Sequence, residues 1–85
     1  MTNQLVKDVE KAIEFGSEIC VSIRTTNDTA MSVVCIPEYI EVNANKITIL
    51  CGHNLFDIVF DVIEYDDFFN TYYISDDTIE ISISI

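Results

Sequence analysis

The chain has 85 residues, of which 49 % are hydrophobic, with only two Gly and one Pro. This composition indicates one small folded domain, residues 1–85, and excludes a linker or low-complexity segment. The formal net charge is −11, from 15 Asp or Glu against four Lys or Arg. Such a charge argues against direct binding of nucleic acid or of an anionic membrane, and it favours basic protein partners.

The cysteines and the first residues of the chain favour a cytoplasmic location. Met1 is followed by TNQLVKD, which has neither a basic start nor an apolar signal segment. No apolar run reaches the ~18 residues that a membrane-spanning helix needs. We therefore expect a cytoplasmic protein in which Cys20, Cys35 and Cys51 are reduced and behave as small apolar side chains.

The first segment, residues 2–15, has the apolar spacing of an amphipathic helix. Leu5, Val9 and Ala12 lie on one stripe together with Val6 and Ile13. Thr2 or Asn3 is a suitable N-cap. Gly16 follows the last apolar position, where a left-handed residue commonly ends a helix.

Alternating patterns follow the helix and predict strands. Residues 18–26 and 29–36 form one expected hairpin across Asn27-Asp28, and Pro37 ends its second strand. Residues 39–43 and 46–51 form a second hairpin across Ala44-Asn45, and residues 52–54 form a break. The clearest strand is the last one, in which Ile79, Ile81, Ile83 and Ile85 alternate with polar residues.

Residues 55–65 fit two structures. As a helix, Asp57, Asp61 and Glu64 share one face opposite an apolar stripe. As strands, Phe56, Ile58, Phe60 and Val62 share one side, and the abundance of Phe, Ile and Val favours strands over a helix. We favour strands, because the alternation immediately downstream continues the same pattern. In that case Glu64 lies opposite Asp57 and Asp61 unless the chain bends.

Groups suited to catalysis or metal binding are sparse. His53 is the one histidine, two residues from Cys51, and we interpret it as an exposed loop residue beside a buried thiol. The Cys and His spacings match no zinc pattern, and the Asp66-Asp67 and Asp76-Asp77 pairs lack the spacing of a calcium loop. We expect a protein that is not an enzyme and that has no cofactor.

Acidic and aromatic residues are concentrated in residues 54–85, which contain no Lys, Arg or His. Acids on alternate strand positions lie about 6.6 Å apart, a spacing similar to that of successive phosphates. They are suited to engaging Arg and Lys in a nucleic-acid-binding groove, with exposed aromatic rings as anchors. The candidate partner-binding residues are Asp57, Asp61, Glu64, Tyr65, Asp66, Asp67, Phe68, Phe69, Asp76, Asp77 and Glu80.

The segments Ile63-Glu64-Tyr65-Asp66-Asp67, Thr71-Tyr72-Tyr73-Ile74 and Asp76-Asp77-Thr78-Ile79-Glu80-Ile81 resemble small acidic proteins of phages and mobile elements. These include anti-CRISPR and other anti-defence proteins, several of which mimic DNA. The resemblance concerns the general character of the last third of the chain, and it carries over no residue-level role. It implies a stoichiometric inhibitor without catalytic activity.

The expected fold is α+β, with one N-terminal helix packed on a twisted antiparallel sheet of about five or six strands. The expected function is inhibition of a bacterial immune effector, a CRISPR nuclease or complex, by occupation of its basic DNA-binding surface in the host cytoplasm. One alternative is a self-associating module that forms a homodimer through its C-terminal strand. Another is an immunity protein or antitoxin that neutralises a basic toxin.

Overall fold

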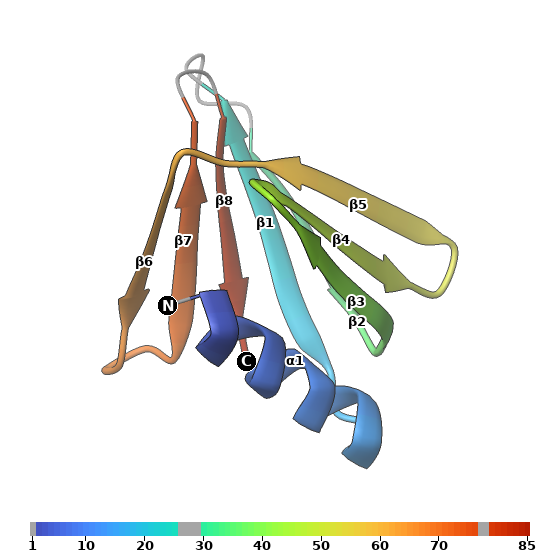
Figure 1. The fold of residues 1–85 in the computed structure, drawn as a ribbon. Helices are drawn as coiled ribbons and strands as arrows, with labels where there is room; N and C mark the ends of the chain where they lie inside the picture. Colours follow the sequence, from blue (N-terminus) through green and yellow to red (C-terminus); the bar gives the residue numbers. More distant parts are fainter. Residues whose placement is uncertain (1, 26–29, 77–78) are drawn as a thin grey trace.

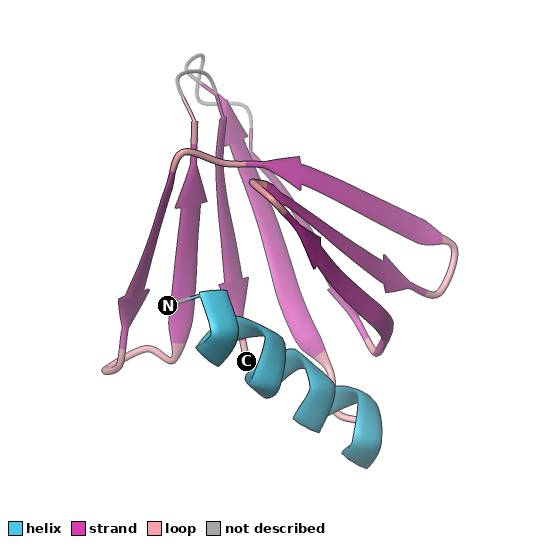
Figure 2. Ribbon diagram, in the orientation of Figure 1, coloured by secondary structure: helices cyan, strands magenta, loops and turns pink. Residues whose placement is uncertain are grey.

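The computed structural model describes residues 2–25, 30–76 and 79–85, which form one helix and eight strands in two antiparallel sheets (Figures 1 and 2). The helix α1 is Thr2–Phe15. The strands are β1 (Ile19–Thr25), β2 (Ala30–Cys35), β3 (Pro37–Asn43), β4 (Lys46–Cys51), β5 (Asn54–Val59), β6 (Val62–Asp66), β7 (Thr71–Ser75) and β8 (Ile79–Ser84). The α+β class and the N-terminal helix are confirmed. The single sheet of five or six strands is wrong, and the expected turn at Asn27-Asp28 lies outside the described residues.

The two sheets are connected at two corners. One sheet has the strand order β2-β1-β8-β7-β6, and the other has the order β3-β4-β5. The chain leaves the first sheet after β2 through Ile36 and Pro37, and it returns to the opposite edge through Phe60 and Asp61. Proline lacks a backbone N–H donor and fixes its own φ angle, so a buried Pro37 suits a corner where β2 pairing stops. Strand patterning predicts the strands, but it does not reveal this change of sheet.

Helix α1 packs against both sheets, because it contacts β3 of the three-stranded sheet and its Asp8 accepts a hydrogen bond from Tyr72 on β7 of the other (Figure 1). Its residues Leu5, Val9 and Ala12 are buried in the common core, as their spacing predicts. Gly16 has φ +64°, and the N–H of Ser17 donates to the carbonyl of Ala12 at 2.9 Å. The predicted helix end at Gly16 is therefore confirmed.

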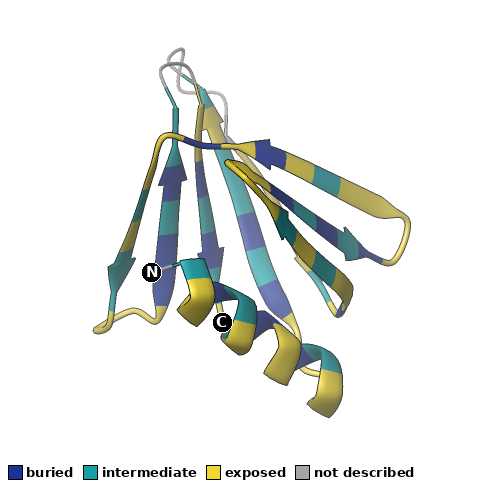
Figure 3. Ribbon diagram, in the orientation of Figure 1, coloured by how far each residue is buried: buried dark blue, intermediate teal, exposed yellow. Residues whose placement is uncertain are grey.

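The core is formed by inward-facing residues of both sheets (Figure 3). Most of the isoleucines of the alternating strands are buried, and Phe60 and Tyr72 are buried with them. Of the four alternating isoleucines at the end of the chain, Ile81 and Ile83 are buried, whereas Ile79 and Ile85 are exposed. The fully or nearly fully buried residues of this core are Leu5, Val9, Ala12, Ile19, Val21, Ile47, Ile49, Cys51, Ile58, Phe60, Tyr72, Ile74, Ile81 and Ile83.

The C-terminal strand β8 lies in the middle of the five-stranded sheet, between β1 and β7. Its backbone therefore pairs on both sides, as in Val21↔Ile83 and Tyr72↔Ile83. The expectation that this terminal strand lies at a sheet edge and pairs with a second copy is wrong. The edges of this sheet are β2 and β6.

Candidate protein-binding site

Residues 55–65 form strands, and a bend divides them between the two sheets. Asp57 on β5 belongs to the three-stranded sheet, while Glu64 on β6 belongs to the five-stranded sheet. Asp61 lies at the corner between them, where its N–H donates to the carbonyl of Ser75 at 2.9 Å. The preference for strands is confirmed, and these three acids do not form one stripe.

The remaining candidate acids occupy both ends of the five-stranded sheet. Asp66 and Asp67 lie at the β6–β7 turn, whereas Asp76 follows the other end of β7. Five strand residues separate these ends, a distance of about 15 Å. Glu80 lies on β8 in register with Arg24, and Asp77 lies outside the described residues. The eleven candidate residues therefore do not all share one surface.

One exposed cluster combines both kinds of candidate residue, and we call it the acidic–aromatic tip. It consists of Glu64, Asp66, Asp67, Phe68 and Phe69, at and beside the β6–β7 turn. Phe68 is 82 % exposed and Phe69 is 64 % exposed. Their rings meet edge to face, with centroids 4.8 Å apart. Two neighbouring Phe rings in water are unfavourable for an isolated domain, and such a patch commonly marks a contact surface.

The turn that carries the two rings is held by local hydrogen bonds. The Asp66 carboxylate accepts from the backbone N–H of Phe68 at 2.9 Å and from that of Phe69 at 3.4 Å. The Thr71 hydroxyl donates to the carbonyl of Phe69 at 2.9 Å. Asn70 adopts φ +49°, and its carbonyl accepts from the N–H of Ile85 at 3.1 Å. The exposed rings are therefore presented by a structured turn, which lowers the entropy lost on binding.

Two tyrosines support the tip from below. Tyr65 and Tyr72 pack with ring centroids 4.6 Å apart, and the Tyr65 hydroxyl donates to the Asn70 side-chain oxygen at 3.0 Å. Tyr72 is fully buried and donates its hydroxyl to the Asp8 carboxylate of α1. Burial, and then this hydrogen bond to Asp8, raise the pKa of Tyr72. Tyr65, predicted as a binding residue, is half-buried and supports the turn.

Charge distinguishes the tip from the acids of the other sheet. Glu64 and Asp67 are exposed, and the whole stretch 54–85 contains no Lys, Arg or His. Asp57, by contrast, accepts from the Thr48 hydroxyl at 2.7 Å and lies 3.9 Å from the Lys46 ammonium. Part of its negative charge is therefore compensated within the domain. Among the described residues, no ion pair of this kind is found for Glu64, Asp66 or Asp67, so no close cation compensates their charge.

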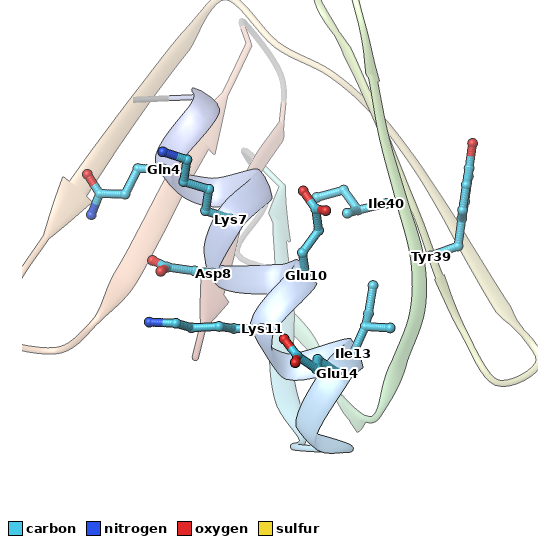
Figure 4. A pocket seen from close by; sticks show the side chains of 9 residues that line it. All are labelled: Gln4, Lys7, Asp8, Glu10, Lys11, Ile13, Glu14, Tyr39 and Ile40. Carbon is cyan, nitrogen blue, oxygen red and sulfur yellow. The ribbon is translucent and has the colours of Figure 1, made fainter.

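A second surface feature was not predicted from the sequence. An open groove of about 820 Å³ lies between α1 and β3 (Figure 4). Its helical side has both signs of charge, including Lys7, Asp8 and Lys11, and Tyr39 and Ile40 line the other side. The Tyr39 hydroxyl donates to Glu41 at 2.7 Å, and this bond raises the pKa of Tyr39. Because side chains of both charge signs line this open groove, its lining does not favour a ligand of one charge sign over the other.

The groups considered for catalysis lie apart from the tip. His53 is exposed in the turn between β4 and β5, and Cys51 is buried. Burial, and then a hydrogen bond with Cys35, raise the pKa of Cys51 to about 12, so this thiol is protonated at neutral pH. Within residues 2–25, 30–76 and 79–85, no three His, Cys, Asp or Glu side chains are grouped to hold a metal ion.

Comparisons with protein-family models, with curated proteins and with solved structures find no match for this chain. In the described part of the chain, no helix has the length and apolar character required to cross a membrane. The site is therefore assigned from its own geometry.

Proposed function

We propose that this protein is a non-catalytic inhibitor that docks its acidic–aromatic tip on a basic, nucleic-acid-binding surface of another protein. The partner class we favour is a bacterial immune effector, such as a CRISPR nuclease or complex, whose access to DNA is blocked in the host cytoplasm. The observation that carries the proposal is the exposure of Phe68 and Phe69 on a hydrogen-bonded turn that is flanked by the exposed acids Glu64 and Asp67.

The chemistry of the tip supports this class of partner. Each Phe ring offers about 150–250 Å² for burial, and the Asp and Glu carboxylates are suited to paired hydrogen bonds with Arg. Glu64 and Asp66 occupy alternate positions of β6, so they lie about 6.6 Å apart. This pair, with Asp67, is the part of the chain that we expect to occupy phosphate positions in a basic groove.

The test is capture of partners from a bacterial lysate with two variants. One variant carries Phe68→Ala and Phe69→Ala, and the matched control carries Phe15→Ala. Phe15 is 72 % exposed at the end of α1, so the control removes a comparable ring from a different surface. Captured proteins are identified by mass spectrometry, and their release is followed with added DNA and with rising salt.

We expect the wild type and the Phe15→Ala control to capture a nucleic-acid-binding protein that DNA displaces and that salt weakens. The double variant is expected to lose it. Capture that persists in the double variant, or a partner that DNA does not displace, would contradict the proposal. An immunity protein or antitoxin remains the alternative, and it is distinguished by a partner that is a toxin.

A further inference from the structure

Two of the three cysteines lie at the corner where the chain passes from β2 into β3. Cys35 is the last residue of β2, and Cys51 is the last residue of β4. Pro37 follows Cys35 by two residues and pairs with Cys51 in the ladder between β3 and β4. The corner therefore brings together one cysteine from each sheet.

Both of these side chains face the core that the two sheets share. Cys51 is buried in this core, and Cys35 is half-buried and packs against it. Cys35 is in register with the buried Ile19, which places it on the inner face of β2. The two thiols are close enough to interact directly. Cysteines whose side chains converge in this way can be joined by a disulfide without a large movement of the backbone.

The third cysteine provides an internal comparison. Cys20 is in register with Val34, the residue before Cys35, so its side chain is on the outer face of the sheet. Its thiol lies 3.8 Å from the Ser22 hydroxyl on the same strand. The sheet itself therefore separates Cys20 from the other two thiols.

We propose that Cys35 and Cys51 form an oxidisable pair, which a small-molecule disulfide such as oxidised glutathione converts into a disulfide bond between the two sheets. In a reducing compartment both residues remain thiols, and the bond forms when such disulfides accumulate. The pair thus makes the stability of the fold depend on the redox state of its surroundings.

The reaction consists of two successive thiol–disulfide exchanges. Cys35 reacts first, because its thiol is half-buried while that of Cys51 is buried. After losing its proton to water, the Cys35 sulfur attacks one sulfur of the reagent, the S–S bond of the reagent breaks, and one thiol is released. The Cys51 sulfur then gives up its proton and attacks the Cys35 sulfur of the mixed disulfide, which releases the second thiol. Two protein thiols are oxidised, and the reagent is reduced to two thiols that carry the two protons.

The bond changes how the two sheets are held together. The chain itself connects them at the corners through Pro37 and Phe60. A disulfide adds a direct link between β2 and β4, and it closes a loop of about 15 residues, which stabilises the fold by restricting the unfolded chain. The acidic–aromatic tip belongs to neither of the linked strands, so this inference does not depend on the proposed function.

The experiment is treatment of the reduced, folded protein with oxidised glutathione, followed by alkylation of the remaining thiols and digestion with trypsin. Trypsin cleaves after Arg24 and Lys46, and it thereby places each of the three cysteines in a different peptide. We expect mass spectrometry to find residues 25–46 joined to residues 47–85. We also expect the thermal midpoint to rise by roughly 10 °C and to return to its original value with reduced glutathione.

Two matched variants locate the bond. Cys20→Ser should form the same linked peptides and show the same rise in thermal midpoint. Cys35→Ser should show neither the link nor the rise, although Cys20 and Cys51 are still present in it.

Three results would overturn the proposal. They are a folded wild type that keeps its thiols or carries only glutathione adducts, a link that involves Cys20, and a linked protein whose thermal midpoint does not rise. Capture of a partner by the tip is measured with the cysteines reduced, so the two proposals can fail separately.

Discussion

The two edges of the five-stranded sheet differ in charge and in the side chains that they expose. The β6 edge carries Glu64 and Asp66 and leads to the exposed Phe68 and Phe69. The β2 edge has no charge and exposes Met31 and Val34. Both are edge strands of the same sheet, so they differ in side-chain charge and not in the kind of backbone groups that they present.

This difference teaches that the two edges of one sheet in a very acidic protein can respond differently to another chain. An acidic edge attracts basic surfaces and repels a second acidic copy. An uncharged edge offers backbone pairing without such repulsion. Each of the following predictions removes or alters one element of this contrast, in order of decreasing effect.

The largest effect is expected at β8, the central strand of the sheet, which is two strands from each edge. Ile83 on β8 is fully buried between the neighbouring β1 and β7. Ile83→Ala should lower the free energy of unfolding by about 2–5 kcal/mol, because it leaves a cavity. Ile79→Ala on the same strand is the control, since Ile79 is exposed and should change stability by less than about 1 kcal/mol. Urea denaturation measures both variants, and equal losses would contradict a central position for β8.

The second effect concerns binding alone. Combining Phe68→Ala with Phe69→Ala should weaken the complex with the captured partner by at least about 2 kcal/mol, a factor of about thirty. Stability should change by less than about 0.5 kcal/mol, because both rings are in solvent. Isothermal titration calorimetry gives the affinity, and Phe15→Ala is the control. A stable double variant with unchanged affinity would place the contact elsewhere.

Local patterns in the sequence predict much of the fold. The spacing of Leu5, Val9 and Ala12 predicts the helix, and Gly16 predicts its end. Alternation predicts β4, and it predicts β8 except for the exposure of Ile79. These features succeed because they depend on residues close together in the chain. The division into two sheets depends on the corners at Pro37 and Phe60, whose effect appears only when distant strands pair.

The candidate site is only partly predictable for the same reason. The sequence identifies Asp66, Asp67, Phe68 and Phe69 correctly as neighbours, because a turn keeps consecutive residues together. It also includes Asp57 and Glu64 in one candidate set, although the corner at Asp61 sends them to different sheets. The uncharged edge is not predictable from β2 alone, because edge position is a property of the strand order.

The third prediction separates charge from turn geometry at the tip. Asp66→Ala removes the acceptor for two backbone N–H groups, so it should lower the free energy of unfolding by about 1–2 kcal/mol and weaken partner binding. Asp66→Asn keeps a side-chain acceptor, so it should retain more stability and more partner binding than Asp66→Ala. Asp67→Asn removes charge without a known turn contact, and it should reduce the salt dependence of binding with little loss of stability.

The same distinction applies to charge reversal. The Asp76 carboxylate accepts from the N–H of Ile79 at 2.8 Å, so Asp66→Lys and Asp76→Lys both remove turn acceptors. Asp67→Lys is therefore the cleaner test of the electrostatic contribution. The neutralising variants give the matching outcome. If Asp66→Ala and Asp67→Asn change binding and stability in the same proportion, the hydrogen bonds of Asp66 to the turn contribute nothing beyond the charge of the carboxylate.

The smallest effect is expected in alkali, and it comes from two buried groups with raised pKa values, the Cys51 thiol on β4 and the Tyr72 hydroxyl on β7. Cys51 contacts Cys35 at the end of β2, and its pKa is raised from 9.0 to about 12, first by burial. The folded state therefore retains the thiol proton between these values while the unfolded state loses it. This contribution to stability is fully present below pH 9 and decreases as the pH rises toward 12.

Tyr72, on β7 next to β6, also has a raised pKa. Burial and its hydrogen bond to Asp8 raise this pKa above the ordinary 10.0. Its contribution is complete below pH 10 and is lost at higher pH. We expect the stability advantage of the wild type over Cys51→Ala to narrow above pH 9, and that over Tyr72→Phe to narrow above pH 10. Urea denaturation at a series of pH values measures both differences. If the advantage stays constant in alkali, the group has the same pKa in the folded and unfolded chains, and its burial does not make stability depend on pH.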